Sequence, residues 1–210
     1  CICDKEDFPD CNNIIFPQPF QSNIAHSGTN FCAINSNFLS YKNKAQISNI
    51  KNNLSVLISF GAVDSKNISG KLLDLIIENI NVFKHKINFT IVIGKSNLNF
   101  DNIKTKYELL KNYSNTKVNV KIIFNPEKIE KIIKNSHIAI GAPGISHLER
   151  MYCGLPSILI SQNNTQKSLT KQWKILGAAI SVEDNLIDVI RYLSEYSFDI
   201  DYLSKIRNKG

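Results

Sequence analysis

The feature that most restricts the fold is a repeating unit, in which a short apolar run ends near a glycine and is followed by apolar residues at helical spacing. In the first unit the run Val56-Leu57-Ile58 stops at Gly61, and apolar residues then recur at intervals of three and four over 72–80. Short β-branched runs that end at glycine are typical of buried strands. The unit therefore predicts a strand, a turn and a helix.

The same unit recurs to the end of the sequence. Further strands are predicted at 89–93, 118–124, 138–140, 157–160 and 178–182. Helices are predicted at 103–113, from 127 (opened by Asn125-Pro126-Glu127), from 146, at 166–176 and at 183–196. Strands that alternate with helices in units of about 25 residues are typical of a parallel sheet covered on both faces. The predicted fold class is α/β, a Rossmann-like doubly wound parallel sheet.

The composition is that of a folded globular protein. Of the 210 residues, 43% are hydrophobic and 20% are charged, which suits one buried core. The net charge of +7 comes from singly scattered lysines without a basic stripe, so we expect no nucleic-acid partner. No apolar stretch approaches the ~18 residues of a membrane span, and no signal peptide is recognisable. We expect a cytoplasmic protein without a membrane span.

Five cysteines raise the question of a metal site. Four of them lie in the first 32 residues, but a single residue separates Cys1 from Cys3, where zinc sites have about two to four, and no histidine pair follows at ligand spacing. Cys153 lacks the histidine and asparagine context of a nucleophile. We therefore expect reduced thiols, no metal ion and no cofactor.

The richest motif is Gly141-Ala142-Pro143-Gly144-Ile145-Ser146-His147-Leu148-Glu149-Arg150. It places a tight turn at a strand end and a carboxylate about one turn into the next helix. Backbone N–H groups of Gly144, Ile145 and Ser146, at a helix N-terminus, can bind phosphate oxygens. Glu149 can accept hydrogen bonds from both ribose hydroxyls, or it is a helix-start acid that faces solvent. The motif, with Gly141 and Ala142 at its start, predicts a nucleotide diphosphate site.

Other segments are predicted at the same edge, because the carboxyl ends of parallel strands share it. Gly61 and Ala62 follow the first strand and can supply further backbone donors. Asp64 is either part of this site or the N-cap of the next helix. Gly94 ends the second strand of the series. Gln166 begins a helix, where its amide can reach a phosphate or a sugar hydroxyl, or can simply face solvent.

A catalytic residue is harder to find. His147 lies inside the phosphate turn, but a helix N-terminus disfavours an imidazolium, and no nearby carboxylate is placed to orient the ring. Its expected role is at the surface or in packing. We predict no catalytic residue in this chain.

Spaced motifs carry a resemblance to a known family. They are Ser59-Phe60-Gly61-Ala62-Val63-Asp64, residues 138–144, Glu149-Arg150 with Gly154-Leu155-Pro156-Ser157, and Gln166 before 177–179. In this order they resemble the C-terminal half of the UDP-2,4-diacetamido-2,4,6-trideoxy-β-L-altropyranose hydrolase of pseudaminic acid biosynthesis. The match covers about residues 30–210. The broader group includes spore-coat polysaccharide proteins and the glucosaminyltransferase of peptidoglycan lipid-intermediate synthesis.

The resemblance implies the C-terminal domain of a GT-B fold, which binds UDP or a UDP-sugar, while a separate N-terminal domain supplies the catalytic groups. Such hydrolases use water to cleave the sugar C1–oxygen bond and release UDP. Residues 1–50 then correspond to the tail of the N-terminal domain and the crossover from it. Residues 51–210 correspond to the nucleotide-sugar-binding domain, which we expect to be inactive by itself.

The sequence also departs from the family pattern. Pro143 and Ile145 replace a glycine and a hydroxyl residue in the phosphate turn, and Pro143 removes one backbone donor. Gly61-Ala62 stands where the family has two glycines. Two other functions therefore stay open: the donor-binding domain of a GT-B glycosyltransferase, and a non-catalytic nucleotide-sugar-binding domain.

Overall fold

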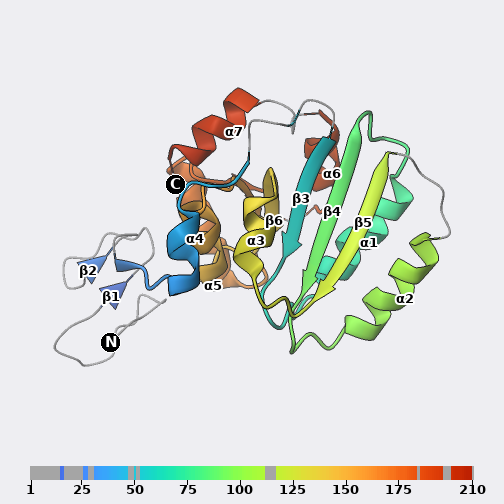
Figure 1. Ribbon diagram of the computed structural model, residues 1–210, viewed down its shortest axis with the longest axis horizontal. Coiled ribbons are helices and arrows are strands. Elements are labelled where there is room, and N and C mark those ends of the chain that lie inside the picture. The colour runs from blue at the N-terminus through green and yellow to red at the C-terminus, as the bar shows by residue number, and fades with distance from the viewer. Residues whose placement is uncertain are drawn as a thin grey trace.

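The fold is given by a computed structural model, which describes residues 15–16, 26–27, 31–46, 50, 53–111, 117–183, 185–195 and 200–209. Two short strands, β1 (Ile15–Phe16) and β2 (His26–Ser27), pair in parallel. A 3-10 helix, η2 (Ser36–Tyr41), follows. The β1–β2 pair stands apart from the main sheet (Figure 1).

The main body is one six-stranded sheet in which every neighbouring pair is parallel. Its strands are β3 (Asn53–Ser59), β4 (Lys86–Ile93), β5 (Val118–Phe124), β6 (Ile138–Gly141), β7 (Ser157–Leu159) and β8 (Ile180–Ser181). They lie in the order β5-β4-β3-β6-β7-β8. The chain therefore builds outward from β3 in one direction, returns, and builds outward in the other. This is the doubly wound α/β arrangement that the sequence predicts.

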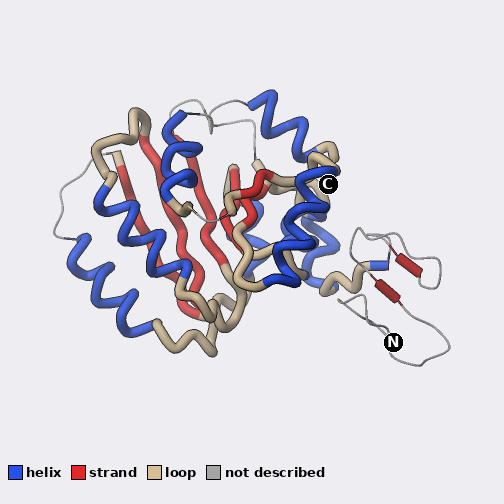
Figure 2. Tube along the Cα trace, turned by 180° about the vertical axis from the view of Figure 1, so that it is seen from behind, coloured by secondary structure: helices blue, strands red, loops and turns tan. Residues whose placement is uncertain are grey.

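Helices cover both faces of this sheet (Figures 1 and 2). They are α1 (Ile68–Glu78), α2 (Phe100–Lys111), α3 (Ile129–Lys134), α4 (Ile145–Tyr152), α5 (Asn164–Ile175), α6 (Ile187–Glu195) and α7 (Ile200–Arg207). Side chains of β3 alternate between the faces, as strand geometry requires. Val56 and Ile58 pack into the core that contains α1 and α6, whereas Leu57 packs toward η2 and α3. None of the described helices has the length and hydrophobicity that crossing a bilayer requires.

The structure differs from the sequence prediction in the bounds of several elements. The helix predicted at 183–196 begins at Ile187, and the strand predicted at 178–182 spans Ile180–Ser181. Two other helices differ further. The helix expected from residue 127 begins at Ile129, because Asn125 adopts a φ of 42° and donates its N–H to the carbonyl of Ile93 at 2.9 Å. Pro126 thus lies in a turn before the helix and not in its first turn. Helix α7 was not predicted, since Leu203 and Ile206 are its only fully buried residues, and two apolar residues give a weak periodic signal.

Both described cysteines carry free thiols, as expected. Cys32 is half-buried and Cys153 is buried. Burial raises the pKa of the Cys153 thiol to about 12, and nearby carboxylates add to this effect, so the thiol is unreactive. Cys1, Cys3 and Cys11 lie outside the described residues.

His147 lies in the interior and is fully buried. Its ring meets the Trp173 ring edge-on, with centroids 5.2 Å apart, and neither ring nitrogen has a hydrogen-bond partner among the described residues. Burial lowers the pKa of His147 well below its ordinary value of 6.5, and the charge of Arg150 lowers it further. The histidine therefore has a packing role, one of the two roles expected from the sequence.

This burial predicts a pH dependence of folding. The folded-state pKa of His147 is depressed, so its contribution to the free energy of unfolding should be fully present above about pH 6.5. That contribution should fall as the pH drops below this value, by up to about 1.4 kcal/mol per pH unit. Urea unfolding between about pH 7.5 and 5.5 measures the slope. His147→Leu should lose this part of it, whereas His85→Gln, at an exposed position, should keep it. Parallel pH curves for the wild type and His147→Leu would contradict the prediction.

Candidate functional site

The carboxyl ends of β3 and β6 lie side by side, where Ser59 pairs with Gly141. From these two ends the chain continues in opposite directions, to β4 on one side and to β7 on the other. In open α/β sheets such a switch point leaves a crevice, and ligands bind there. The loop 60–67 after β3 and the turn 142–144 after β6 border this position. Residues from the two strongest sequence motifs are therefore brought together.

The turn after β6 is held by Arg150, which is 1% exposed. Its Nη2 donates to the carbonyl of Ala142 at 2.8 Å, and its Nε donates to the hydroxyl of Ser157 at 3.1 Å. A side chain at Gly141 would collide with the carbonyl of Ser59 and lie 2.8 Å from Nη1 of Arg150. Burial lowers the pKa of Arg150 to about 10, so the guanidinium is charged at neutral pH. A buried cation thus lies behind the turn.

Helix α4 begins directly after this turn, with Gly144 as its N-cap residue. No side chain caps it, and a Cβ added to Gly144 would meet nothing within 4 Å. Neighbouring helices are different: Asp64 accepts from the N–H groups of Ile68 and Ser69 at 2.8 and 2.9 Å in the first turn of α1, and Asn163 caps α5. The N-terminus of α4 therefore presents its N–H groups and dipole to open space.

Gln162 joins the loops that follow β3 and β7. Its Nε2 donates to the carbonyl of Phe60 at 3.5 Å, and its Oε1 accepts from the hydroxyl of Ser65 and the N–H of Lys66 at 3.3 and 3.4 Å. The side-chain oxygen of Gln166 accepts from the N–H of Gln162 at 2.8 Å. Gln166 therefore shapes this loop and is not merely solvent-facing, and its NH₂ group remains for a ligand.

Two glycines let the loop after β3 cross the end of β4. Gly61 adopts a φ of 80°, in the left-handed region that favours glycine. A β-carbon at Gly94 would collide with the backbone of Ala62, so packing accounts for glycine at this position. Contact between Gly94 and a ligand stays a prediction.

Glu149 lies on α4 and is half-buried. Its carboxylate has no hydrogen-bond partner in the described part of the chain. Burial raises the pKa of Glu149, and Arg150 opposes this. The carboxylate is close enough to Cys32 to help raise the pKa of that thiol. A half-buried carboxylate without donors is a strong acceptor for a diol.

The structure thus sorts the sequence-predicted residues into two groups. The first group is at least partly exposed and stays the predicted ligand-binding set: Gly61, Ala62, Ala142, Gly144, Ile145, Ser146 and Glu149. Gly141, Gly94, Asp64 and Gln166 build the frame, and Asp64 is the cap that the sequence left as its alternative. The sequence missed the roles of Arg150 and Gln162. A buried arginine beside an acid in the motif was a weak signal, but Gln162 had none, because its partner Phe60 is 102 residues away.

Comparisons with known proteins bear on the fold. No known protein-family profile matches the chain. It is 27% identical to an uncharacterised protein of Methanocaldococcus jannaschii over 142 residues, which are 67% of this chain and 28% of that protein. The chain therefore spans less than a third of that relative.

The similar solved structures include the following two. MurG of Acinetobacter baumannii has a TM-score of 0.64 at 14% identity, over 93% of this chain and 55% of MurG. The glycosyltransferase SsfS6 of Streptomyces sp. SF2575, solved with thymidine diphosphate, has a TM-score of 0.52 at 12% identity, over 97% of this chain and 49% of SsfS6. At these identities the likeness concerns the fold. The chain has a Rossmann-like α/β fold that is similar to part of each of these two structures.

Proposed function

We propose that this chain is the UDP-binding domain of a nucleotide-sugar hydrolase, completed by a separate N-terminal catalytic domain and acting in bacterial surface nonulosonic acid (pseudaminic acid-like) biosynthesis. The observation that carries the nucleotide part is the uncapped N-terminus of α4, which opens onto free space above the buried Arg150. Helix N-termini of this kind bind phosphate through N–H groups and the helix dipole.

The diphosphate fits between the two loops at the switch point. On one side the N–H groups of Ile145 and Ser146 start α4, and the charge of Arg150 favours an anion there. On the other side the exposed Gly61 and Ala62 offer backbone donors. Pro143 cannot donate, so fewer donors come from the turn itself. The site therefore relies on the helix end and the buried cation.

The ribose is assigned to Glu149, one turn further along α4. This carboxylate is half-buried and lacks a donor in the described structure, and two ribose hydroxyls would supply two charge-assisted hydrogen bonds. The hydrolytic activity rests on the resemblance of the spaced motifs 59–64, 138–144 and 149–157. A GT-B glycosyltransferase would use the same site for its donor. The two functions differ in the acceptor used by the full-length protein, which is water for the hydrolase and a sugar or lipid for the transferase.

Calorimetric titration of the chain tests the nucleotide assignment. UDP should bind more tightly than ADP or the free sugar, because the proposed phosphate and ribose contacts lie in this domain. The chain should not release UDP from a UDP-sugar at typical enzyme rates of about 1–1000 per second, since it supplies no positioned base for water. No heat with UDP at millimolar concentration, from a folded sample, would refute the assignment.

The Glu149→Gln variant keeps the shape of the side chain but removes its charge. UDP affinity should fall about tenfold or more, which corresponds to ~1.4 kcal/mol, while the unfolding midpoint should stay nearly unchanged. Glu149 lies beyond the first turn of α4, so the helix-start role that the sequence left open does not apply. If Glu149 instead only offsets the charge of the buried Arg150, its loss should lower stability and leave UDP affinity alone. Measuring both quantities on the same variant separates these outcomes.

The Gly144→Asp variant tests the uncapped helix end. Gly144 has an extended N-cap conformation with a φ of −78°, which other residues adopt, so Asp should cap α4 and raise stability by about 0.3–1 kcal/mol. Its carboxylate would occupy and repel the position proposed for phosphate, so UDP affinity should fall at least tenfold. Gly144→Asn, which caps without a charge, should cost less affinity. Unchanged UDP binding in Gly144→Asp would place the phosphates elsewhere.

A further inference from the structure

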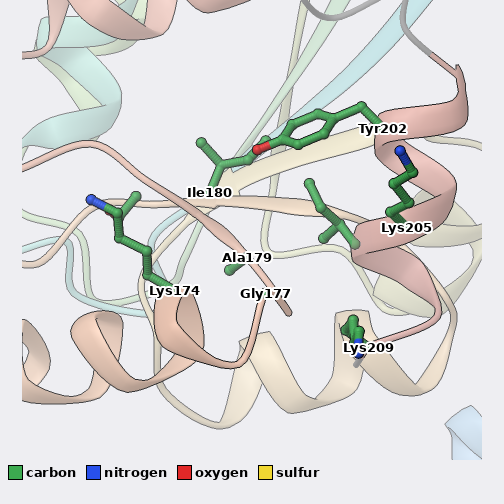
Figure 3. A pocket seen from close by; sticks show the side chains of 9 residues that line it. Lys174, Gly177, Ala179, Ile180, Tyr202, Lys205 and Lys209 are labelled. Atoms are coloured by element: carbon green, nitrogen blue, oxygen red, sulfur yellow. The ribbon is translucent and has the colours of Figure 1, made fainter.

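A second concave site lies where α5, β8 and α7 meet, away from the switch point. It is a half-open pocket of about 350 Å³, within the range of small-molecule sites. Figure 3 shows Lys174 of α5 on one side and Tyr202, Lys205 and Lys209 on the other, with Ala179 and Ile180 between them.

The charge on this pocket has one sign. Lys174, Lys205 and Lys209 are exposed and line it, and no carboxylate is among its lining residues. In the described structure none of the three lysines makes an ion pair. Three uncompensated ammonium groups around one concavity raise the local concentration of anions. The ligand should therefore carry negative charge.

The floor of the pocket is apolar. It is formed by Gly177, Ala179, Ile180 and Ile206, and the half-exposed Tyr202 ring adds to it. Ser181 also lines the pocket, and its hydroxyl has no hydrogen-bond partner among the described residues. An inorganic anion would leave the apolar surface uncovered. A ligand with an apolar body and an anionic group would use both parts.

We propose that this pocket binds an anionic amphiphile, an organic phosphate or carboxylate with a short apolar body. The body packs on Ala179, Ile180 and the Tyr202 ring, and the charged group reaches the lysines. The pocket lies at the C-terminal end of α5, whereas the N-terminal end of α5 follows Gln162, which contacts the loop after β3. The two ends of a 12-residue helix are roughly 18 Å apart. Both ligands therefore fit at once, and this site does not depend on the proposed UDP-binding function.

Calorimetry with octyl phosphate, below the concentration at which it forms micelles, tests the proposal. Octyl phosphate should bind, and both inorganic phosphate and uncharged octyl glucoside should bind at least tenfold more weakly, because each lacks one half of the recognised chemistry. Inorganic phosphate that binds as tightly as octyl phosphate would overturn the proposal, as would the absence of octyl phosphate binding.

A triple variant locates the site. Lys174→Gln, Lys205→Gln and Lys209→Gln together should weaken octyl phosphate at least tenfold and leave UDP affinity unchanged, so that failure here and failure of the nucleotide proposal are distinguishable. The matched control changes the exposed lysines at 84, 104 and 121 to Gln, which removes the same charge, and it should bind octyl phosphate like the wild type. Equal losses in the two triple variants would mean a general charge effect and would overturn the site.

The source of the amphiphile is tested with membranes. If the ligand is a lipid headgroup, vesicles of phosphatidylglycerol and phosphatidylcholine should sediment the wild-type chain and the control variant but not the pocket variant. If it is a soluble metabolite, octyl phosphate binds while these vesicles do not sediment the chain. Vesicle binding that survives in the pocket variant, together with unchanged octyl phosphate binding, would refute the pocket as the site.

Discussion

The candidate site depends on one buried cation, the guanidinium of Arg150. Bringing an arginine out of water is costly unless hydrogen bonds replace the lost hydration, and here the carbonyl of Ala142 and the hydroxyl of Ser157 do so. The side chain thereby connects the turn after β6 to the start of β7. Gly141 makes this approach feasible, because any β-carbon would collide with the neighbouring strand. The turn, its rigidity and its positive potential follow from this single residue.

Helix capping distinguishes α4 from the helices on either side of it, α1 and α5, although the short helix α3 also lacks a side-chain cap. The first turn of α1 is occupied by the Asp64 carboxylate, and that of α5 by Asn163. Helix α4 begins at Gly144 without any cap, so its dipole faces open space above a buried cation. An uncapped helix end costs stability. A bound phosphate would supply the hydrogen-bond acceptors that a capping side chain otherwise provides. The free N–H groups at the start of α4 therefore explain two expectations: that an anion binds there selectively, and that its binding stabilises the fold.

Positive charge is used differently at the switch point and at the α5–β8–α7 pocket. At the switch point the cation is buried and fixed by hydrogen bonds, which suits a ligand with defined geometry such as a diphosphate. At the pocket, the lysines are exposed and flexible, and they surround an apolar floor. Flexible ammonium groups tolerate ligands of varied shape. This contrast is why the second site is assigned to a class of amphiphile and not to one compound.

The sequence by itself determined the alternation of strands and helices that builds the main sheet, but not α7. Apolar runs marked the six strands of the main sheet, because strand burial on both faces leaves a local signature, and three of these runs end near Gly61, Gly94 and Gly141. The segment 141–150 marked the turn after β6. The sequence did not determine the strand order, which pairs Ser59 with Gly141 and brings Gly94 against the backbone of Ala62. It also could not choose between ligand and cap for Asp64, start α3 at Ile129, or reveal the link from Gln162 to Phe60. Those features depend on contacts between residues far apart in the chain. Such contacts form only when the sheet has assembled, so local sequence patterns do not predict them.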